Sequence, residues 1–217
     1  MNNGSQLKIV VLISGRGSNL EAIIKACGNK VNAEIVGVIS NRPDAAGLKI
    51  AKNNEINHIV IDHTAFTNRE EFENRLELEL KKFNTDLIIL AGFMRVLTAK
   101  FVNSFRGKMI NIHPSLLPEL QGLNTHRRAL ELKKNEHGAS VHFVTEDLDG
   151  GPVIMQASVP VLDTDDEAAL GSRVLEKEHI ILPKTIEYFA KNRIYLDNEN
   201  KIYFDGDILK DPIHLEE

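Results

Sequence analysis

The segment from Asn111 to Pro118 carries the residues of this chain best suited to chemistry. Asn111 and His113 lie two residues apart, so an extended segment would direct both side chains to the same side. Pro114 lacks an N–H and restricts His113 to extended geometry, so a strand should end there. A carboxamide and an imidazole can donate two hydrogen bonds to one oxygen, and histidine can also move a proton near neutral pH. Acyl transfer needs these groups, because a carbonyl oxygen gains negative charge in its transition state.

A glycine-rich loop near the N-terminus indicates anion binding. Residues 14–19, Ser-Gly-Arg-Gly-Ser-Asn, lie between an apolar run and a segment with helical spacing, where backbone N–H groups can face an anion. A dinucleotide fingerprint is excluded, because Leu20 stands at its third glycine and no acid follows the second strand at Ser40 and Asn41. The Gly-Lys-Ser/Thr of a Walker loop is also missing. The loop therefore suits a phosphate monoester, and the alternative is an ordinary turn with Ser18 as the helix N-cap.

Asp149 begins the sequence Asp-Gly-Gly-Pro, which separates the β-rich runs 140–145 and 153–157. Asp-Gly-Gly between apolar runs is typical of a β-hairpin. On a tight turn, the Asp149 carboxylate could reach Asn111 and His113. The alternative is that all three polar residues only form turns or cap a strand.

The hydrophobic pattern predicts an α/β fold. Apolar runs near 8–13, 34–39, 58–61, 86–91 and 108–113 alternate with helical patterns near 18–27, 45–54, 68–83 and 124–134. This alternation predicts a Rossmann-like, mostly parallel sheet with helices on both faces. An antiparallel C-terminal part should follow after residue 137. We expect a long helix over 165–191, acidic in its first turn, then a short hairpin from Arg193, with frayed ends at 1–6 and 209–217.

Composition narrows the classes of function. The chain has 217 residues, a net charge of −5 and a pI near 5.9, which favours neither nucleic acid nor an anionic membrane as partner. No apolar stretch is long enough to span a bilayer, and no signal-peptide pattern follows Met1. The single cysteine, Cys27, excludes an internal disulfide, suits a reducing, cytoplasmic compartment and is interpreted as a helix core residue. No metal site is predicted, since His126 and His137 lack a partner at ligand spacing.

Four motifs occur in order along the chain. They are Ser-Gly-x-Gly-Ser-Asn at 14–19, Leu-Ala-Gly-Phe-Met-Arg at 90–95, Asn-Ile-His-Pro-Ser-Leu-Leu-Pro at 111–118, and Gly-x-Ser-Val-His-Phe-Val at 138–144 leading into Asp-Gly-Gly-Pro at 149–152. In these motifs, over about residues 7 to 205, the chain resembles the folate-dependent phosphoribosylglycinamide formyltransferases of purine synthesis. The resemblance implies the formyltransferase fold in one domain, 1–217, with a phosphate-binding half (about 7–106) and a folate-binding and catalytic half (about 107–205).

The resemblance also implies a reaction. A formyl group would move from the co-substrate 10-formyltetrahydrofolate to the amine of glycinamide ribonucleotide, without a metal, in a monomer or weak homodimer. Asn111 and protonated His113 would hold the oxyanion. Asp149 would keep His113 charged and oriented, and would help to relay a proton through water.

Further site residues follow from the same resemblance. The expected ribonucleotide contacts are Gly17, Ser18, Asn19 and Glu178. The expected folate contacts are Arg69, Met94, Arg95, Val96, Leu97, Asn111, Thr145 and Asp149. His142 matches a position near the active site. Without the resemblance, Glu178 would be a solvated helix acid, Arg69 one charge on an exposed helix, and His142 a core histidine with one hydrogen bond.

The chain departs from the family pattern after Pro118. Leu120 stands in place of an aromatic residue, Gln121 in place of a proline and Asn124 in place of a histidine. Loss of the proline predicts a more mobile loop on the folate side, with the catalytic trio intact.

Three other functions share part of this pattern. A formyltetrahydrofolate hydrolase would share the Asn-x-His and Asp core, but would not need the phosphate loop and normally has an added regulatory domain. A methionyl-tRNA formyltransferase should carry a C-terminal domain and a basic surface. A non-catalytic nucleotide-binding module would keep the glycine loop without any need for the trio.

Overall fold

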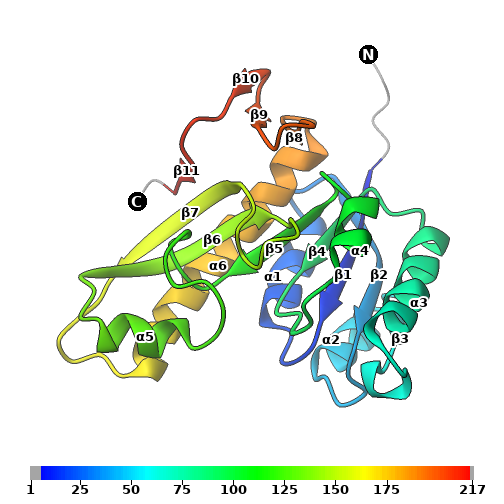
Figure 1. Ribbon diagram of the computed structural model, residues 1–217, viewed down its shortest axis with the longest axis horizontal. Helices are drawn as coiled ribbons and strands as arrows, with labels where there is room; N and C mark the ends of the chain where they lie inside the picture. The colour runs from blue at the N-terminus through cyan, green and yellow to red at the C-terminus, as the bar shows by residue number, and fades with distance from the viewer. Residues whose placement is uncertain (1–5, 216–217) are drawn as a thin grey trace.

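The computed structural model describes residues 6–215, and a large twisted sheet forms its centre (Figure 1). Its strands are β1 (Leu7–Ile13), β2 (Ala33–Ser40), β3 (His58–Val60), β4 (Leu87–Leu90), β5 (Met109–His113), β6 (Glu136–Phe143), β7 (Val153–Pro160) and β11 (Ile213–His214). Their order across the sheet is β11-β7-β6-β5-β4-β1-β2-β3. The pairs among β1 to β5 are parallel, whereas β6 runs antiparallel to both β5 and β7. The predicted change from parallel to antiparallel pairing is confirmed.

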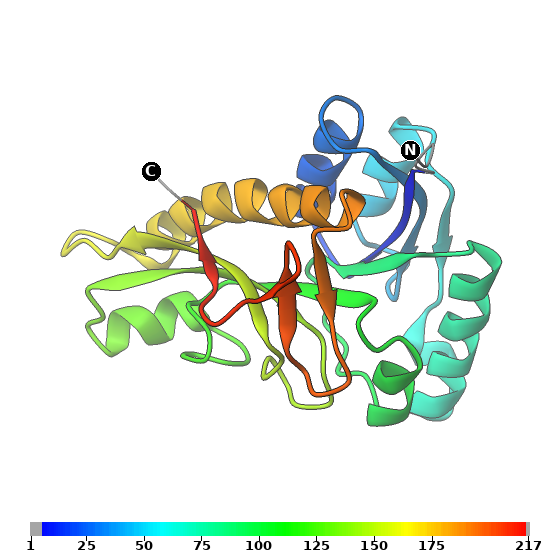
Figure 2. The same ribbon diagram turned by 90° about the horizontal axis from the view of Figure 1, so that it is seen from above.

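The helices lie on both faces of this sheet, as predicted. They are α1 (Ser18–Cys27), α2 (Gly47–Asn53), α3 (Arg69–Lys82), α4 (Ala99–Ser104), α5 (Thr125–Glu131) and α6 (Glu167–Ala190), with a short 3-10 turn, η1 (His63–Ala65). Figure 2 shows α6 lying along one side of the sheet with α1, while α3 and α4 lie on the other side. The sequence pattern predicted neither α4 nor η1, because each is too short to show a helical period.

Successive side chains of β1 contribute in turn to the two hydrophobic clusters, one on each face of the sheet. Val11 and Ile13 pack in the cluster that includes α1 and α6, whereas Val10 and Leu12 pack in the cluster that includes α3 and α4. Successive side chains of a strand point to opposite faces, so a strand covered on both faces must be apolar throughout. This is why the central strands have continuous apolar sequences.

The chain reverses direction across the sheet between β1 and β4, and this reversal determines where ligands can bind. Strands β2 and β3 extend to one side of β1, and β4 and β5 to the other. In open α/β sheets, ligands bind beyond the carboxyl ends of the strands at such a switch point. The loops after β1, β4 and β5 therefore meet at one edge, and these loops carry three of the four sequence motifs.

The link between β6 and β7 differs from the predicted tight hairpin. The strands end and begin at Phe143 and Val153, which leaves a loop over 144–152. Asp149 adopts a left-handed backbone with φ of 49°. Gly151 lies so close to the Phe143 carbonyl oxygen that an added Cβ would approach it to 1.8 Å. Asp-Gly-Gly thus allows a close backbone crossing at the end of a wider loop.

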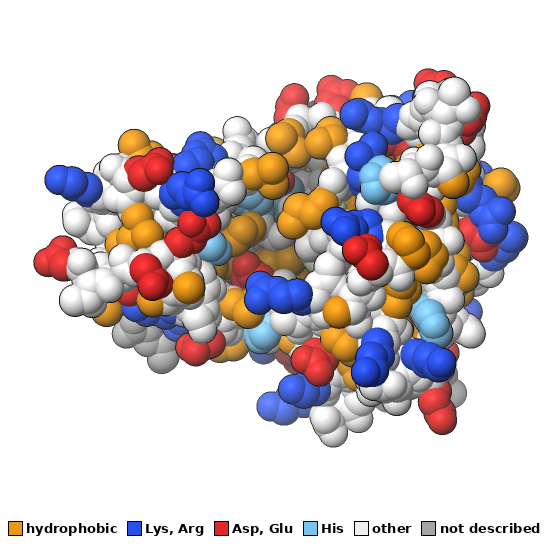
Figure 3. Space-filling model, turned by 90° about the horizontal axis from the view of Figure 1, so that it is seen from below, with side chains coloured by type: hydrophobic (Ala, Val, Ile, Leu, Met, Phe, Trp, Pro, Cys, Tyr) orange, Lys and Arg blue, Asp and Glu red, His pale blue; other side chains and the backbone are white. Residues whose placement is uncertain are grey.

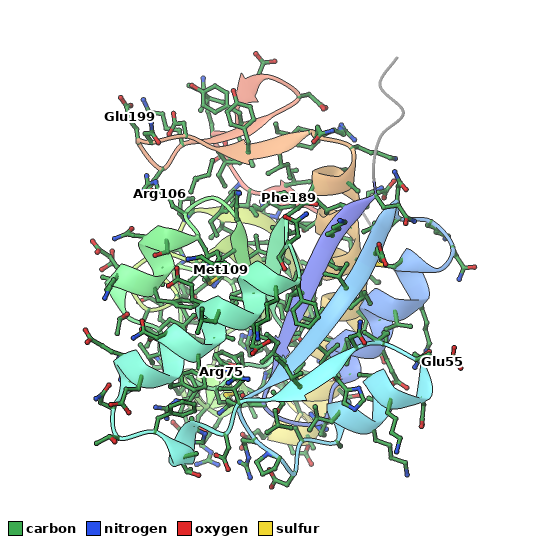
Figure 4. The ribbon with its side chains drawn as sticks, turned by 90° about the vertical axis from the view of Figure 1, so that its right-hand side faces the viewer. Glu55, Arg75, Arg106, Met109, Phe189 and Glu199 are labelled. Carbon is green, nitrogen blue, oxygen red and sulfur yellow. The ribbon has the colours of Figure 1, made fainter. Side chains whose placement is uncertain are left out.

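The C-terminal segment is anchored, contrary to the predicted fraying over 209–217. The predicted hairpin is present as β8 (Ile194–Leu196) and β9 (Ile202–Phe204), and β10 (Asp207–Ile208) extends it. Strand β11 then pairs with β7, and Leu215 N donates to Gln156 O at 3.0 Å. Arg106 joins the small sheet to the main body by donating to Asn198 O at 2.8 Å, beside Glu199 (Figure 4). Residues 1–5, 216 and 217 of the predicted frayed ends lie outside the described residues.

Two further features bear on the sequence predictions. Cys27 is half-buried at the end of α1, and burial raises the pKa of its thiol to about 11, which agrees with a structural role. Within residues 6–215, every helix is too short or too polar to cross a membrane.

The long helix α6 begins at Glu167 rather than at the predicted residue 165. Asp166 is the N-cap, and its side chain accepts a hydrogen bond from Ala169 N at 2.7 Å. Asp165 lies before the helix and pairs with Arg173 at 2.7 Å. The two acids therefore fix the start of α6 through contacts with its first two turns.

Replacing Asp166 with alanine should lower the free energy of unfolding by about 1 kcal/mol, because one N–H of the first turn loses its partner. For a chain of this size the melting temperature should fall by roughly 2–4 °C. Thermal unfolding followed by circular dichroism measures this change. Asp163→Ala is the matched control, since Asp163 is exposed and makes no side-chain hydrogen bond or ion pair within the described residues. Equal melting temperatures for the two variants would contradict the capping role.

Candidate active site

The carboxyl end of β5 brings the three predicted catalytic residues together. Strand β5 ends at His113, as Pro114 predicted. Asp149 reaches this corner from the 144–152 loop. Its Oδ2 lies 3.5 Å from His113 Nδ1, and its Oδ1 lies 3.5 Å from Asn111 Nδ2. One carboxylate thus faces both the imidazole and the carboxamide, at distances that a bound substrate could shorten.

His142 fixes the orientation of the Asn111 carboxamide. The two residues lie opposite each other on β5 and β6, and Asn111 Nδ2 is 3.1 Å from His142 Nε2. His142 Nδ1 lies 2.9 Å from the Phe143 carbonyl oxygen, so Nδ1 carries the proton and Nε2 accepts from Asn111. Burial lowers the pKa of His142 to about 4, which keeps this tautomer neutral. His142 is a core histidine, and it also holds one N–H of Asn111 while the other is directed toward Asp149.

The loop after Pro118 encloses the same corner through its backbone. The Leu120 carbonyl oxygen lies 3.1 Å from His113 Nε2, and Gly122 N donates to Asp149 Oδ2 at 3.0 Å. Strands β6 and β7 hold the segment before this loop, because Ser140 Oγ accepts from Leu117 N and Gln156 Nε2 donates to Leu117 O. The loop was predicted to be more mobile, but these contacts fix it to the corner formed by Asn111, His113 and Asp149. The contributions of Leu120 and Gly122 could not be found from sequence, because they use main-chain atoms.

An open cleft lies beside Asn111. Figure 3 shows the hollow on the face seen from below, with apolar and charged side chains around it. It is lined by Leu90, Phe93, Arg95, Val96, Leu97, Val102, Asn111, His142, Val144, Thr145, Glu146, Asp147, Leu148 and Asp149. Two buried polar atoms of its lining, Arg95 Nε and Thr145 Oγ1, have no hydrogen-bond partner within the described chain. Apolar walls with a few unused polar groups fit a flat heterocycle such as the pterin of a folate.

Some of the predicted folate-binding residues line this cleft, and others lie outside it. Leu97 is buried and Val96 half-exposed, and both line the cleft together with Arg95 and Thr145. Met94 is exposed and lies outside the lining, but its backbone N–H donates to Ser14 Oγ at 2.7 Å. Arg69 is exposed at the start of α3 and is not brought to the cleft, so its contact with folate stays a prediction.

Ser14 links the loops that follow β1, β2 and β4. Besides accepting from Met94, its hydroxyl donates to Asn41 Oδ1 at 2.5 Å, and both side chains are buried. The Asn41 Nδ2 atom in turn lies 3.1 Å from His63 Nδ1. Ser14 and Asn41 stand at predicted strand ends in the sequence, where neither was assigned a binding or structural role. Only adjacent strand order reveals that they touch.

The glycine-rich loop has the tight geometry that its composition predicted. Gly17 has a left-handed φ of 84°, and an added Cβ would lie 2.6 Å from the Gly47 Cα. Gly17, and not Ser18, is the N-cap of α1. The alternative reading of Ser18 as the cap is therefore wrong, and its hydroxyl is half-buried beside the free N–H groups of the first turn.

Glu178 lies against this loop from α6. It is only 7 % exposed, and its Oε2 accepts from Asn19 Nδ2 at 2.6 Å. Burial raises the pKa of Glu178, opposed by the Asn19 hydrogen bond and by Arg16. The alternative of a solvated helix acid is therefore wrong. A carboxyl buried beside a glycine-rich loop, with Asn19 Oδ1 left without a partner in the described chain, is an arrangement typical of a binding site.

His126 and His137, for which the sequence predicted no metal site, lie side by side. His126 Nδ1 is 3.1 Å from His137 Nε2. Burial lowers the pKa of both rings, that of His137 to about 4. No group of three or more metal-ligating side chains is found between residues 6 and 215.

Comparison with known proteins agrees with this geometry. The model of the formyl transferase family matches residues 7–186. The Escherichia coli phosphoribosylglycinamide formyltransferase is 48 % identical over 201 residues, which are 92 % of this chain and 94 % of that protein. The human trifunctional purine biosynthetic protein adenosine-3 is 44 % identical over 90 % of this chain and 19 % of its own length.

A solved structure agrees over the whole fold. The phosphoribosylglycinamide formyltransferase of Coxiella burnetii, solved in complex with CHES, has a TM-score of 0.93 and 47 % identity, covering 97 % of this chain and all of that chain. The match includes the mostly parallel mixed sheet. The chain therefore belongs to the formyl transferase family and is a formyl-transferring enzyme.

Proposed function

We propose that this enzyme transfers the formyl group of 10-formyltetrahydrofolate to the amine of 5-phosphoribosylglycinamide, a step of purine synthesis. The products are formylglycinamide ribonucleotide and tetrahydrofolate. The observation that carries the proposal is the Asp149 carboxylate, which faces both Asn111 and His113 beside the cleft. The family and its named relatives, phosphoribosylglycinamide formyltransferases, support the same reaction.

Asn111 and His113 stabilise the charge that develops on the formyl oxygen. When bound, 10-formyltetrahydrofolate supplies an electrophilic formyl carbon. One Asn111 N–H is held by His142, and because the carboxamide is planar this contact also fixes the direction of the other N–H, which faces Asp149 and donates to a substrate oxygen placed there. His113 exchanges its contact with the Leu120 carbonyl for the same oxygen. Two donors placed before the reaction stabilise the transition state without the free-energy cost of reorganising water.

Asp149 orients the imidazole and moves the proton. Its Oδ2 faces His113 Nδ1, so a ring with both nitrogens protonated has an acceptor on each side. A new bond forms between the substrate amine and the formyl carbon, and the bond from that carbon to N10 breaks. The proton lost by the amine passes through water near Asp149 to N10. Charge and atoms balance without a metal ion.

The two substrates approach from opposite sides of this corner. The ribonucleotide phosphate binds at Gly17, Ser18 and Asn19, where the α1 N-terminus favours an anion. Glu178 then faces the remaining ribonucleotide and lies beside Asn19. The folate ring enters the cleft along Arg95, Val96, Leu97 and Thr145, while Met94 and Arg69 lie nearer the surface. The halves 7–106 and 107–205 then supply mainly the phosphate loop and the catalytic corner.

The cellular setting is part of the proposal. An acidic chain with one half-buried cysteine suits a cytoplasmic enzyme that acts on small molecules and not on nucleic acid. We propose a monomer or a weak homodimer. Size-exclusion chromatography over a range of protein concentrations measures this state directly.

The function is tested by a spectroscopic assay with a 10-formylfolate donor, run with and without glycinamide ribonucleotide. Turnover that depends on the ribonucleotide supports the proposed transferase. Donor breakdown at the same rate without the ribonucleotide would instead establish a hydrolase, which could use the same trio with water as the nucleophile. Thermal stabilisation by the ribonucleotide without turnover would indicate a non-catalytic binding module.

Asn111→Ala and His113→Ala should each lower kcat by roughly 100- to 1000-fold, because each removes one donor to the developing oxyanion. Steady-state kinetics and thermal melting of the same preparations measure activity and folding separately. Asn103→Ala and His58→Ala are matched controls, since these exposed residues carry the same side chains away from the cleft. A variant that retains the parent's kcat in its folded fraction would refute the catalytic role of that residue.

Glu178→Gln should stabilise the fold and weaken ribonucleotide binding. The pKa of Glu178 is raised by burial, so its ionised form destabilises the folded state at pH values above that raised pKa. The variant should therefore melt at a higher temperature than the parent near neutral pH, and the difference should shrink as the pH falls and Glu178 becomes protonated. The KM for the ribonucleotide should rise, because a neutral amide replaces the charge.

Glu176→Gln is the control for this experiment, since Glu176 is exposed on the same helix. It should change neither the melting temperature nor the KM for the ribonucleotide. If Glu178→Gln behaves like this control at each pH, Glu178 is neither a source of instability nor a binding residue.

A further inference from the structure

Gln121 makes a contact that the proposed mechanism does not use. Its side chain donates from Nε2 to the main-chain oxygen of Asp149 at 3.2 Å. The next residue, Gly122, donates its backbone N–H to Asp149 Oδ2 at 3.0 Å. Two consecutive residues of the 119–124 loop therefore hold both the backbone and the carboxylate of Asp149.

Asp149 needs such support because of its backbone conformation. Its φ of 49° lies in the left-handed region, which is unfavourable for a residue with a Cβ. The segment 145–148 before it is mostly exposed, and Gly150 N–H donates back to Asp147 O within the same loop. A strained residue keeps its conformation only where its surroundings fix it. Apart from Asn111, the contacts that reach Asp149 from outside its loop come from the 119–124 loop and His113 and His142.

Gln121 is itself held in place by helix α5. Arg128 Nη1 donates to the Gln121 carbonyl oxygen at 2.6 Å and also reaches the Leu123 carbonyl oxygen at 3.4 Å. A chain of contacts thus runs from Arg128 through Gln121 to Asp149 and on to His113. The Arg128 contact fixes the Gln121 backbone at a distance from which its side-chain amide reaches Asp149 O.

We propose that Gln121 is a positioning residue that sets the direction of the Asp149 carboxylate toward His113. It touches neither substrate nor reacting atoms in this role, and its effect passes through Asp149. This inference rests on the proposed function, in which Asp149 orients His113 and assists proton transfer. It adds to that function a specific reason why a residue in an exposed loop affects the chemical step.

Gln121→Ala and Gln121→Met test the role of the amide. Alanine removes the side chain, whereas methionine keeps a similar length and replaces the amide with a thioether that cannot donate a hydrogen bond to Asp149 O. Both variants should lower kcat on the order of 10-fold, which is less than the roughly 100-fold loss that a 1 Å misplacement of a reacting group can cause. The KM for glycinamide ribonucleotide should stay unchanged, because the glycine-rich loop lies at another strand end. The melting temperature should also stay close to that of the parent.

Glu119→Ala is the matched control on the same loop. Glu119 is exposed, and its carboxylate pairs with Lys134 at 2.9 Å rather than with Asp149. An exposed ion pair contributes little to stability, so this variant should keep the parent's kcat and both KM values. A comparable loss of kcat in Glu119→Ala would mean that any change in the loop slows the enzyme, and would overturn the assignment to Gln121.

The outcomes separate this inference from the proposed function. If the parent enzyme shows no ribonucleotide-dependent formyl transfer, the proposed function fails. If the parent is active but Gln121→Met keeps its kcat, the amide has no positioning role and the inference alone is overturned. A loss of kcat in both Gln121 variants, with unchanged ribonucleotide KM and melting temperature, supports it.

Discussion

The carboxylate of Asp149 is the contact on which the rest of the site depends. It lies between His113 and Asn111, and the backbone N–H of Gly122 donates to it. These partners come from β5 and from the loop after Pro118, while Asp149 itself comes from the loop between β6 and β7. A charge placed among three segments can be oriented only if the strands beneath them are fixed relative to one another. The sheet supplies that rigidity.

The order of strands explains why Asn111, His113 and Asp149 meet at the end of β5. This strand is the last of the parallel group β1 to β5, and its other neighbour, β6, runs antiparallel. The parallel side brings the loops after β1 and β4 to the carboxyl end of β5. The antiparallel side places His142 directly opposite Asn111, with the 144–152 loop beyond it. One strand end therefore meets the loops after β1 and β4 and the loop that carries Asp149.

Several polar groups at the carboxyl edge of the sheet are buried, although their burial lowers the stability of the folded state. Glu178 is held beside Asn19 although burial disfavours its charge, and His142 is kept neutral in the core. Arg95 Nε and Thr145 Oγ1 line the cleft without partners in the described chain. Native proteins satisfy most buried polar atoms, so these two exceptions in the lining of one cleft indicate where a ligand completes the hydrogen bonds. The buried hydroxyl of Ser14, by contrast, both donates and accepts a hydrogen bond, and so joins the loops after β1, β2 and β4.

The sequence by itself determined the alternation of strands and helices, the end of β5 at His113, and the three polar residues of the catalytic corner. These features follow from local rules, namely hydrophobic period, the geometry of proline and the motifs around Asn111 and Asp149. Only the tertiary structure decided that Glu178 is buried beside Asn19, that β11 pairs with β7, and that Leu120, Gln121 and Gly122 hold His113 and Asp149. Burial depends on which distant element covers a residue, and backbone carbonyl and N–H groups are the same in every residue except proline. Neither property leaves a mark in the local order of side chains.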